Sequence, residues 1–320
     1  MKVILIGNFP TSISLYNYLS TNELLTGVCF QESNNLLSDQ ISWKNSIQKD
    51  GYKTFSTNKQ NLNKEFISWL REQAPDIVLV CGFSLKIPKD ALLIPTYGFL
   101  NIHFGKLPVN RGPDPLFWSI KNQEKNTAIT IHQMDENWDT GKILLEHSTP
   151  IIPGETMGML NSKMSYALSE IIEKAIRLGV SNENYKPQSL DKPHNYRFAP
   201  NLSETTIIWE EQTADDIENL VNACNPKYGG ATTYYQGSPI KILEVSPVNG
   251  QVPLLGKTPG EIVHAHPQEG LFICCKYGKL LKINIISSDA GILTGNKYVH
   301  LGLRQGQLFT SQLKTLSMQV

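Results

Sequence analysis

The chain has 320 residues, 40% of them hydrophobic and 18% charged, a composition typical of a soluble globular protein long enough for two domains. Lys plus Arg and Asp plus Glu are both 29, so the zero net charge gives no global attraction to DNA or to a membrane. Five cysteines show neither a disulfide framework nor metal-ligand spacing, and their odd number fits a reducing cytoplasm, so we expect a cytoplasmic protein without a metal.

The first part of the chain alternates apolar strands with amphipathic helices. Residues 3–6 form an apolar run suited to a strand buried on both faces, and a helix is expected over about 11–19. A second helix is expected over 63–73, before an apolar strand at 77–81. This alternation predicts an α/β, Rossmann-like and mostly parallel sheet. The turn after the first strand lacks the dinucleotide fingerprint Gly-x-Gly-x-x-Gly, which argues against a nicotinamide cofactor.

Two further strands, expected over 98–103 and 128–134, are associated with three polar residues, Asn101, His103 and Asp139. If these strands share one direction, their carboxyl ends meet at the edge of the sheet where open α/β sheets place their sites. There an amide could hold an oxyanion, an imidazole could move a proton and a carboxylate could orient the imidazole, which together suit acyl transfer. Each residue alone is also a common turn former or structural residue, so the hypothesis depends on the combination.

The second part of the chain changes in character. A helix is expected over about 156–178, and the stretch 181–203 is rich in Asn, Pro, Lys and His, as in a linker. We therefore expect a catalytic domain over 1–180 and a C-terminal domain over 204–320. The C-terminal domain is predicted to be a small, open, OB-like barrel, because it contains a set of short strands separated by Gly and Pro: 231–235, 240–245, 260–264, 271–276 and 280–286.

Three other histidines do not add a predicted site. His264 and His266 share one face of a strand, but no third metal ligand is near them in the sequence. His132 lies inside the strand that precedes Asp139, and we expect it to have a core or supporting role rather than a catalytic one.

The polar residues belong to a longer pattern that resembles the 10-formyltetrahydrofolate-dependent formyltransferases. The family signature is Asn-x-His, Leu-Pro-x-x-Arg-Gly and Asp-x-Gly, and the chain has Asn101-Ile-His103, Leu107-Pro-x-x-Arg111-Gly112 and Asp139-x-Gly141. Residues 76–83 resemble the strand that borders the folate pocket of the family. Residues 220–231 and 301–306 resemble the start and end of the C-terminal domain of the methionyl-tRNA and aminoarabinose branches. The resemblance thus covers nearly the whole chain.

The resemblance implies transfer of the formyl group of 10-formyltetrahydrofolate, a co-substrate, to a neutral primary amine. Asn101 and His103 would stabilise the oxyanion, while Asp139 would orient His103 and help to take the proton lost by the amine. It places the folate against Phe83, Ser84, Leu85, Ile87, Asp135 and Trp138. We expect the acceptor to contact Lys106, Pro108, Arg111 and Gly112, where Arg111 could bind an anionic group of the acceptor or could instead pair with Asp114 or hold its own loop. The chain departs from the family at Phe104-Gly-Lys106 and at Trp138, which changes the rim of the pocket.

The acceptor is left open by these motifs. Methionyl-tRNA formyltransferases typically have a basic, Gly- and Arg-rich insertion after the second strand, whereas residues 31–39 here contain no Lys or Arg. Because phosphate contacts dominate nucleic-acid affinity, we expect a small-molecule amine, such as an amino sugar nucleotide or a natural-product amine, rather than tRNA. The close alternative is methionyl-tRNA formylation in translation initiation, with Lys192, Arg197 and Lys227 as candidate tRNA contacts. A non-catalytic folate-binding module and a formyltetrahydrofolate hydrolase are the remaining alternatives.

Overall fold

The structure, a computed structural model, describes residues 1–8, 10–32, 38–182, 184–189, 196–248 and 256–312. The chain forms two compact units. The first unit comprises Met1–Pro115, Asn126–Pro150 and Asn161–Phe198, and the second comprises Leu116–Lys125, Ile151–Leu160 and Ala199–Val320. None of the helices in these described ranges is both long and apolar enough to cross a membrane.

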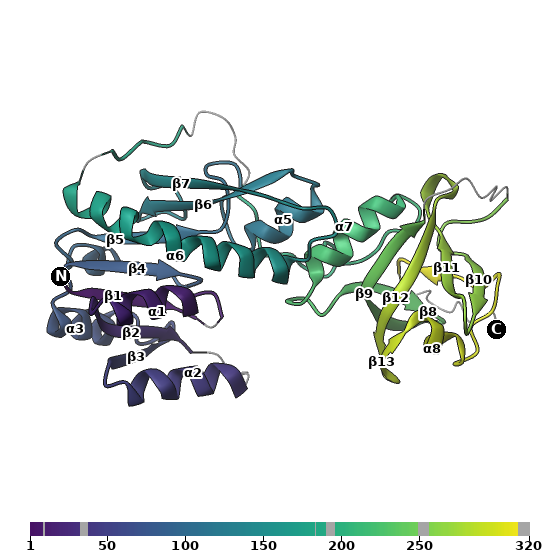
Figure 1. Ribbon diagram of the computed structural model, residues 1–320, viewed down its shortest axis with the longest axis horizontal. Helices are drawn as coiled ribbons and strands as arrows, with labels where there is room; N and C mark the ends of the chain where they lie inside the picture. The colour runs from purple at the N-terminus through teal and green to yellow at the C-terminus, as the bar shows by residue number, and fades with distance from the viewer. Residues whose placement is uncertain (9, 33–37, 183, 190–195, 249–255, 313–320) are drawn as a thin grey trace, which may run out of the picture. The chain divides into compact units, whose positions relative to one another are not determined.

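The first unit is built on a seven-stranded sheet with the order β3-β2-β1-β4-β5-β6-β7 (Figure 1). The strands are β1 (Val3–Gly7), β2 (Leu25–Gln31), β3 (Lys53–Thr57), β4 (Ile77–Cys81), β5 (Phe99–His103), β6 (Asn126–Gln133) and β7 (Ile143–Pro150). All neighbours from β3 to β5 pair in parallel, which confirms the predicted Rossmann-like, mostly parallel sheet.

The expectation that the strands at 98–103 and 128–134 share one direction is wrong, because β6 runs antiparallel to β5. A parallel connection needs a crossover that packs on the face of the sheet, usually a helix. The one helix between these strands, α5 (Pro115–Lys121), belongs almost entirely to the second unit. The chain therefore folds back beside β5, and β7 returns antiparallel to β6.

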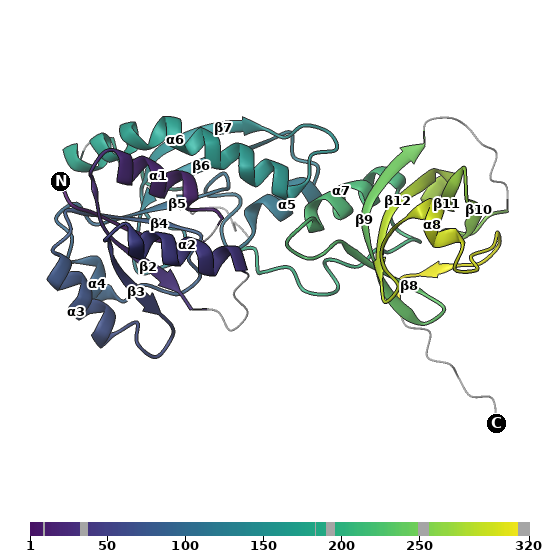
Figure 2. The ribbon, with the colours of Figure 1, turned by 60° about the horizontal axis from the view of Figure 1, so that its bottom comes forward.

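Helices cover both faces of this sheet (Figure 2). One face carries α1 (Ile13–Thr21), α2 (Ser38–Lys49) and α6 (Met157–Ser181), and the other carries α3 (Lys64–Gln73) and α4 (Lys89–Leu92). Helix α3 buries Phe66, Trp69 and Leu70 in a cluster with residues of β1 and β4. Their apolar spacing on one side of the helix explains why the segment is helical and why it packs on the sheet.

The second unit contains an antiparallel sheet with the order β10-β11-β12-β9-β8-β14, with β13 paired to β12. Its strands are β8 (Ala231–Tyr235), β9 (Ser238–Val248), β10 (Ile262–His266), β11 (Gly270–Cys274), β12 (Leu280–Ser288), β13 (Gly291–Thr294) and β14 (Phe309–Thr310). The curled sheet confirms the predicted open, barrel-like domain. Two α-helices and a short 3-10 helix complete the elements from residue 201 onward: α7 (Ala214–Cys224), η1 (Lys276–Gly278) and α8 (Gly295–Val299).

Helix α7 begins at a capping box. The Thr213 side chain accepts a hydrogen bond from the Asp216 N–H, and the Asp216 carboxylate accepts one from the Thr213 N–H. Such a box satisfies two backbone donors that a helix start leaves open. Its acidic residues also suit the positive end of the helix dipole.

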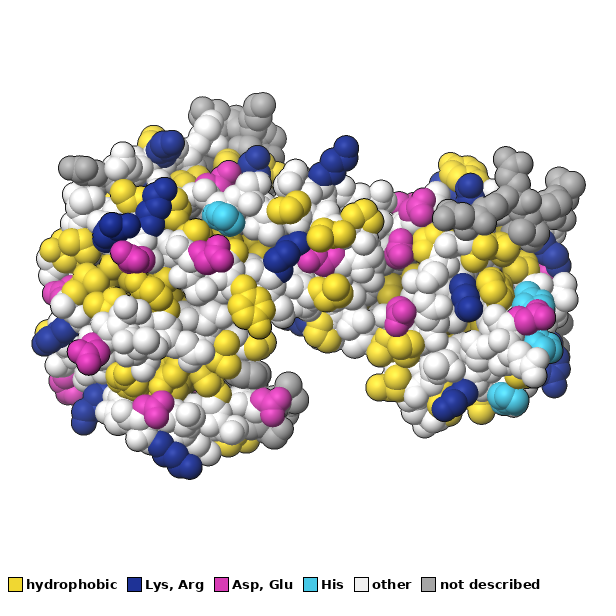
Figure 3. Space-filling view, viewed as in Figure 1, with side chains coloured by type: hydrophobic (Ala, Val, Ile, Leu, Met, Phe, Trp, Pro, Cys, Tyr) yellow, Lys and Arg dark blue, Asp and Glu magenta, His cyan; other side chains and the backbone are white. Residues whose placement is uncertain are grey.

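Charged side chains of both signs are interspersed on the surface. On the face shown in Figure 3, Lys and Arg side chains lie singly among Asp and Glu rather than in one continuous basic patch. Residues 201–320 contain nine Lys and Arg against ten Asp and Glu, so the C-terminal part of the chain is slightly acidic.

Candidate active site

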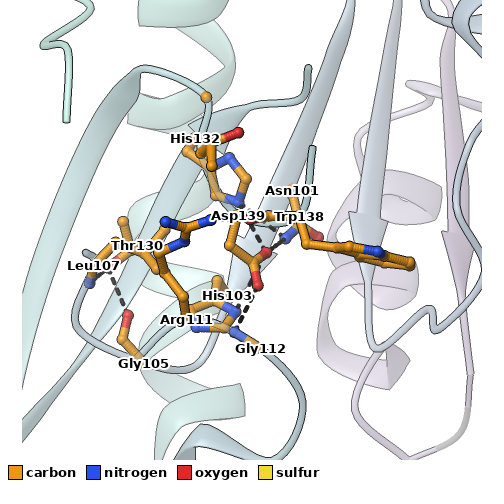
Figure 4. A network of polar contacts seen from close by, with 12 residues as sticks. Asn101, His103, Gly105, Leu107, Arg111, Gly112, Thr130, His132, Trp138 and Asp139 are labelled. Carbon is orange, nitrogen blue, oxygen red and sulfur yellow. Dashed lines mark hydrogen bonds and ion pairs between the residues drawn. The ribbon is translucent and has the colours of Figure 1, made fainter. Parts of the chain in front are cut away.

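The polar site lies on one face of the paired strands β5 and β6. Asn101 and His103 are two residues apart on β5, so their side chains point to the same face. His132 on β6 is directly opposite Asn101 in the antiparallel register and joins them on that face. Asp139 reaches the same place from the loop between β6 and β7 (Figure 4).

The Asp139 carboxylate is the centre of this group. Its Oδ1 lies 3.3 Å from Asn101 Nδ2, 3.5 Å from His132 Nε2 and 3.8 Å from His103 Nδ1. Its Oδ2 accepts a hydrogen bond of 2.9 Å from the Gly112 N–H. The structure therefore brings together Asn101, His103 and Asp139, as the sequence predicts, and adds His132.

The tautomer of His103 follows from its backbone partner. Nε2 lies 2.7 Å from the carbonyl oxygen of Asn110, which can only accept, so the ring proton is on Nε2. Nδ1 then faces Asp139 without a proton. Burial lowers the pKa of His103, although the charge of Asp139 and the Asn110 carbonyl act in the opposite direction. His103 is thus a neutral imidazole at pH 7 whose free lone pair faces a carboxylate.

The carboxyl group of Asp139 is charged under all ordinary conditions. Burial acts to raise its pKa, but His103, His132 and the Gly112 N–H outweigh burial and hold the pKa well below its usual range. A proton that reaches Nδ1 of His103 would therefore meet a full negative charge.

His132 fixes the orientation of the Asn101 amide. Its Nδ1 is 3.0 Å from the carbonyl oxygen of Gln133, which assigns the ring proton to Nδ1 and leaves Nε2 as an acceptor. Nε2 accepts from Asn101 Nδ2 at 3.0 Å, and the second amide hydrogen points toward Asp139 at the longer distance of 3.3 Å. His132 is 2% exposed, so it supports Asn101 from within the protein. The sequence predicts a core or supporting role for His132, and the register of β5 and β6 identifies Asn101 as the residue that it supports.

The loop that carries Arg111 and Gly112 closes one side of the site. The Arg111 guanidinium donates from Nη2 to the Trp138 carbonyl oxygen at 3.0 Å, so it holds the loop that precedes Asp139. Gly112 has φ of +102°, and a Cβ there would lie 2.1 Å from the carbonyl oxygen of Arg197. Only glycine fits this position without moving the loop. Lys106 is exposed and Pro108 half-buried on the same loop, and contact of these four residues with an acceptor stays a prediction.

The residues predicted to contact folate lie in two places. Phe83, Ser84, Leu85 and Ile87 follow β4, with Ile87 buried in the core and Phe83 and Leu85 packed partly against that core. Ser84 donates from its N–H and its hydroxyl to Gln31 Oε1, at 3.0 and 2.8 Å. Because the Ile87 side chain faces the core, its contribution to a pocket would come from its backbone.

Asp135 and Trp138 belong to the loop between β6 and β7. Asp135 accepts hydrogen bonds from the Thr140 hydroxyl and the Asn137 N–H, which closes this loop on itself. The Trp138 side chain is 37% exposed, and its indole extends away from the Asp139 carboxylate (Figure 4). An exposed aromatic ring beside the site is available to a planar ligand, and its contact with folate stays a prediction.

Other candidate chemistry is limited. Among the residues that the structure describes, no group of three or more His, Cys, Asp or Glu side chains could hold a metal ion. His264 Nε2 instead lies 2.6 Å from a carboxylate oxygen of Glu269.

Comparison with known proteins agrees with this geometry. Residues 20–176 match the family model for formyl transferase, and residues 201–299 match that for the formyl transferase C-terminal domain. The methionyl-tRNA formyltransferase of Acetivibrio thermocellus is 32% identical over 73% of this chain and 74% of its own length. The methionyl-tRNA formyltransferase of Halothermothrix orenii is 33% identical over 80% of this chain and 81% of its own length.

Solved structures show the same fold at lower identity. HypX from Aquifex aeolicus matches with a TM-score of 0.66 and 17% identity, over 95% of this chain and 50% of HypX. The N-formyltransferase of Helicobacter canadensis, solved with folinic acid and dTDP-3-aminofucose, matches with a TM-score of 0.61 and 17% identity. The match covers 88% of this chain and 98% of that protein. The family models and the sequence relatives show that the chain belongs to the formyltransferase family, whose members use 10-formyltetrahydrofolate as formyl donor.

Proposed function

We propose that this formyltransferase acts on the primary amine of a small acceptor, such as an amino sugar carried on a nucleotide or a natural-product amine. Family membership leaves the acceptor open, because similar sequences are methionyl-tRNA formyltransferases while similar structures include sugar N-formyltransferases. The observation that carries the proposal is the distribution of charge.

A tRNA substrate requires cations that neutralise several phosphates. Residues 201–320 are slightly acidic, and the first turn of α7 contains Asp215 and Asp216. Residues 31–39 contain no Lys or Arg, and 33–37 lie outside the described residues. Of the candidate tRNA contacts, Lys227 is exposed and Arg197 half-buried, while Lys192 lies outside the described residues. This pattern favours an acceptor held by few ionic contacts.

The donor set fits the chemistry of formyl transfer. When bound, the folate supplies an electrophilic formyl carbon and a nitrogen leaving group. The Asn101 amide gives one hydrogen to His132 Nε2 and directs the other toward Asp139 at the longer distance of 3.3 Å. When the folate binds, this second N–H would turn from the carboxylate to the formyl oxygen and stabilise its negative charge. His103 has a different role from the predicted oxyanion donor, because its Nε2–H is already bonded to the Asn110 carbonyl.

His103 is instead suited to move a proton through Nδ1. The attacking amine loses one proton as its nitrogen bonds to the formyl carbon, and the folate nitrogen gains one as its bond to that carbon breaks. Nδ1 of His103 can take the first proton and return it for the second step, while Asp139 stabilises the imidazolium between them. The protein needs no covalent intermediate for this sequence.

A panel of acceptors tests the proposed function. The enzyme would receive 10-formyltetrahydrofolate with amino-sugar nucleotides, free amino acids or charged initiator tRNA, and tetrahydrofolate release would be followed. We expect an amino-sugar nucleotide or another small amine to give the highest kcat/KM, with a shallow dependence on salt. A tRNA enzyme would lose affinity steeply, with a log–log slope of about −0.7 to −0.9 per phosphate contact.

The alternatives give different results in the same assay. Efficient formylation of initiator tRNA with a steep salt slope would overturn the small-acceptor proposal. Formate release without any acceptor would identify a hydrolase, and folate binding without turnover would identify a non-catalytic module.

The rate should rise with pH when chemistry limits turnover. Burial lowers the pKa of His103 below the ordinary histidine value of about 6.5. As the pH rises, the protonated imidazole, which cannot accept a proton, is therefore lost at a lower pH than for an ordinary histidine. The pKa of Asp139 lies well below its usual range, so this residue adds no limb near neutrality. The acceptor amine adds a second limb at higher pH, because an ammonium group cannot attack. A single-turnover rate that is flat from pH 6 to 9 would contradict amine attack.

A further inference from the structure

The segment that follows α6 contacts the loop that carries Asp139. Lys186 and Ile143 exchange two backbone hydrogen bonds of 2.8 Å, so residues 184–189 run beside the start of β7. Two residues further on, the side chain of Gln188 donates from Nε2 to the carbonyl oxygens of Asp139, at 3.0 Å, and Gly141, at 2.7 Å. Both hydrogens of this amide are therefore used on the backbone around Asp139.

The backbone at Asp139 needs such support. Asp139 has φ of +53°, a left-handed conformation that residues with a side chain rarely adopt. Gly141 is equally constrained, since a Cβ there would lie 1.7 Å from the carbonyl oxygen of Gln133. A strained backbone conformation is maintained only when several contacts with the surrounding structure hold it in place. The two hydrogen bonds of Gln188 add to those of Arg111 and Gly112 in holding this loop, and they come from a segment 47 to 49 residues away.

The placement of Asp139 matters because its contact with His103 is not a short hydrogen bond. Oδ1 and Nδ1 are 3.8 Å apart, and the carboxylate stabilises a proton on Nδ1 only while it faces that nitrogen. Besides Asp139, His103 is faced by His132, whose charge would oppose protonation. A small shift of the Asp139 backbone would thus change how well His103 holds a proton.

We propose that Gln188 is a positioning residue for formyl transfer, which holds the Asp139 backbone so that the carboxylate faces Nδ1 of His103. The inference rests on the proposed role of Asp139 in proton transfer. It assigns function to a residue within the stretch 181–203, which was predicted from composition as a linker.

Two variants of nearly the same shape test this role. Gln188→Glu keeps the outline of the side chain but replaces the donor with an oxygen, and Gln188→Met keeps the stem without any donor. We expect kcat to fall about 10- to 100-fold in both variants, as for a modest displacement of a reacting group. The KM for 10-formyltetrahydrofolate should stay within about twofold, because both Gln188 hydrogen bonds are to backbone carbonyls of the Asp139 loop. Gln48→Glu is the matched control, since Gln48 is exposed on α2 and its side-chain amide donates to the Thr54 hydroxyl, far along the chain from the Asp139 loop.

The pH profile separates positioning from mere support of the fold. In Gln188→Met the acid limb of the single-turnover rate should move to lower pH, because His103 loses part of the charge that favours its protonation. A wild-type kcat in both variants would overturn the inference. An acid limb at the wild-type pH, together with a loss of activity in proportion to the loss of Tm, would also overturn it. Failure of both variants to fold would do the same, since each of these results indicates a structural role. Failure of the proposed role of Asp139 in proton transfer would give a different result from failure of the Gln188 inference, because the Asp139→Asn variant would then be active.

Discussion

Asp139→Asn should lower kcat by about 10²- to 10⁴-fold, the range that a positioned acid–base group contributes. The amide oxygen of Asn can keep the hydrogen bond from the Gly112 N–H, so the loop should stay closed. The amide nitrogen would then face the lone pair on Nδ1 of His103 and donate to it. His103 would be held neutral by that bond and could not accept the proton of the amine. Single-turnover kinetics with a saturating acceptor would measure the loss.

A matched control for this variant lies in the same unit, at the start of the central strand β4. Asp76→Asn also removes one carboxylate that accepts a backbone N–H, that of Lys2, but just before the start of β4. It should leave kcat unchanged. If Asp139→Asn retained the wild-type rate, Asp139 would have no role in proton transfer.

Asn101→Ala should lower kcat by about 10²- to 10³-fold, the usual effect of removing one donor that stabilises an oxyanion. Its effect on KM should be small, since the donor acts on charge that develops during the reaction. The change also leaves Nε2 of His132 without its donor, so part of the loss would come from a displaced imidazole. His132→Phe, which removes the acceptor but leaves Asn101, should cause a smaller loss and thereby separate the two contributions.

Asn22→Ala provides the control for that measurement. Asn22 is exposed at the end of α1, where its amide donates to the Tyr18 carbonyl, and its loss should leave kcat unchanged. If Asn101→Ala lost activity only through a higher KM, the amide would bind substrate rather than stabilise the reacting oxygen.

The sequence predicts much of the fold because its patterns are local. The apolar run at 77–81 coincides with β4, and the helix expected over 63–73 appears as α3, Lys64–Gln73. Strand direction is different, because it depends on where the connecting residues pack. Residues 116–125, which include most of α5, belong to the second unit, so no sheet-covering crossover forms, and no periodicity within the strands reveals this.

The site shows the same division between local and long-range information. Asn101, His103 and Asp139 are identified by a signature within 41 residues, and the structure brings them together. His132 contributes through a cross-strand register, and Gln188 through two hydrogen bonds from a segment that reads as a linker by composition. Side chains whose role depends on such distant partners carry no spacing signal that one sequence can display.

The contacts made after α6 also bear on how this catalytic unit could be separated from the rest of the chain. A fragment that stopped at the end of that helix would lack the amide that fastens the Asp139 loop. It would also lack the Arg197 N–H, which bonds to the Arg111 carbonyl at 2.9 Å, and the carbonyl that packs on Gly112. A fragment that keeps every described contact of the site therefore extends at least to residue 197, well past Ser181, the last residue of α6.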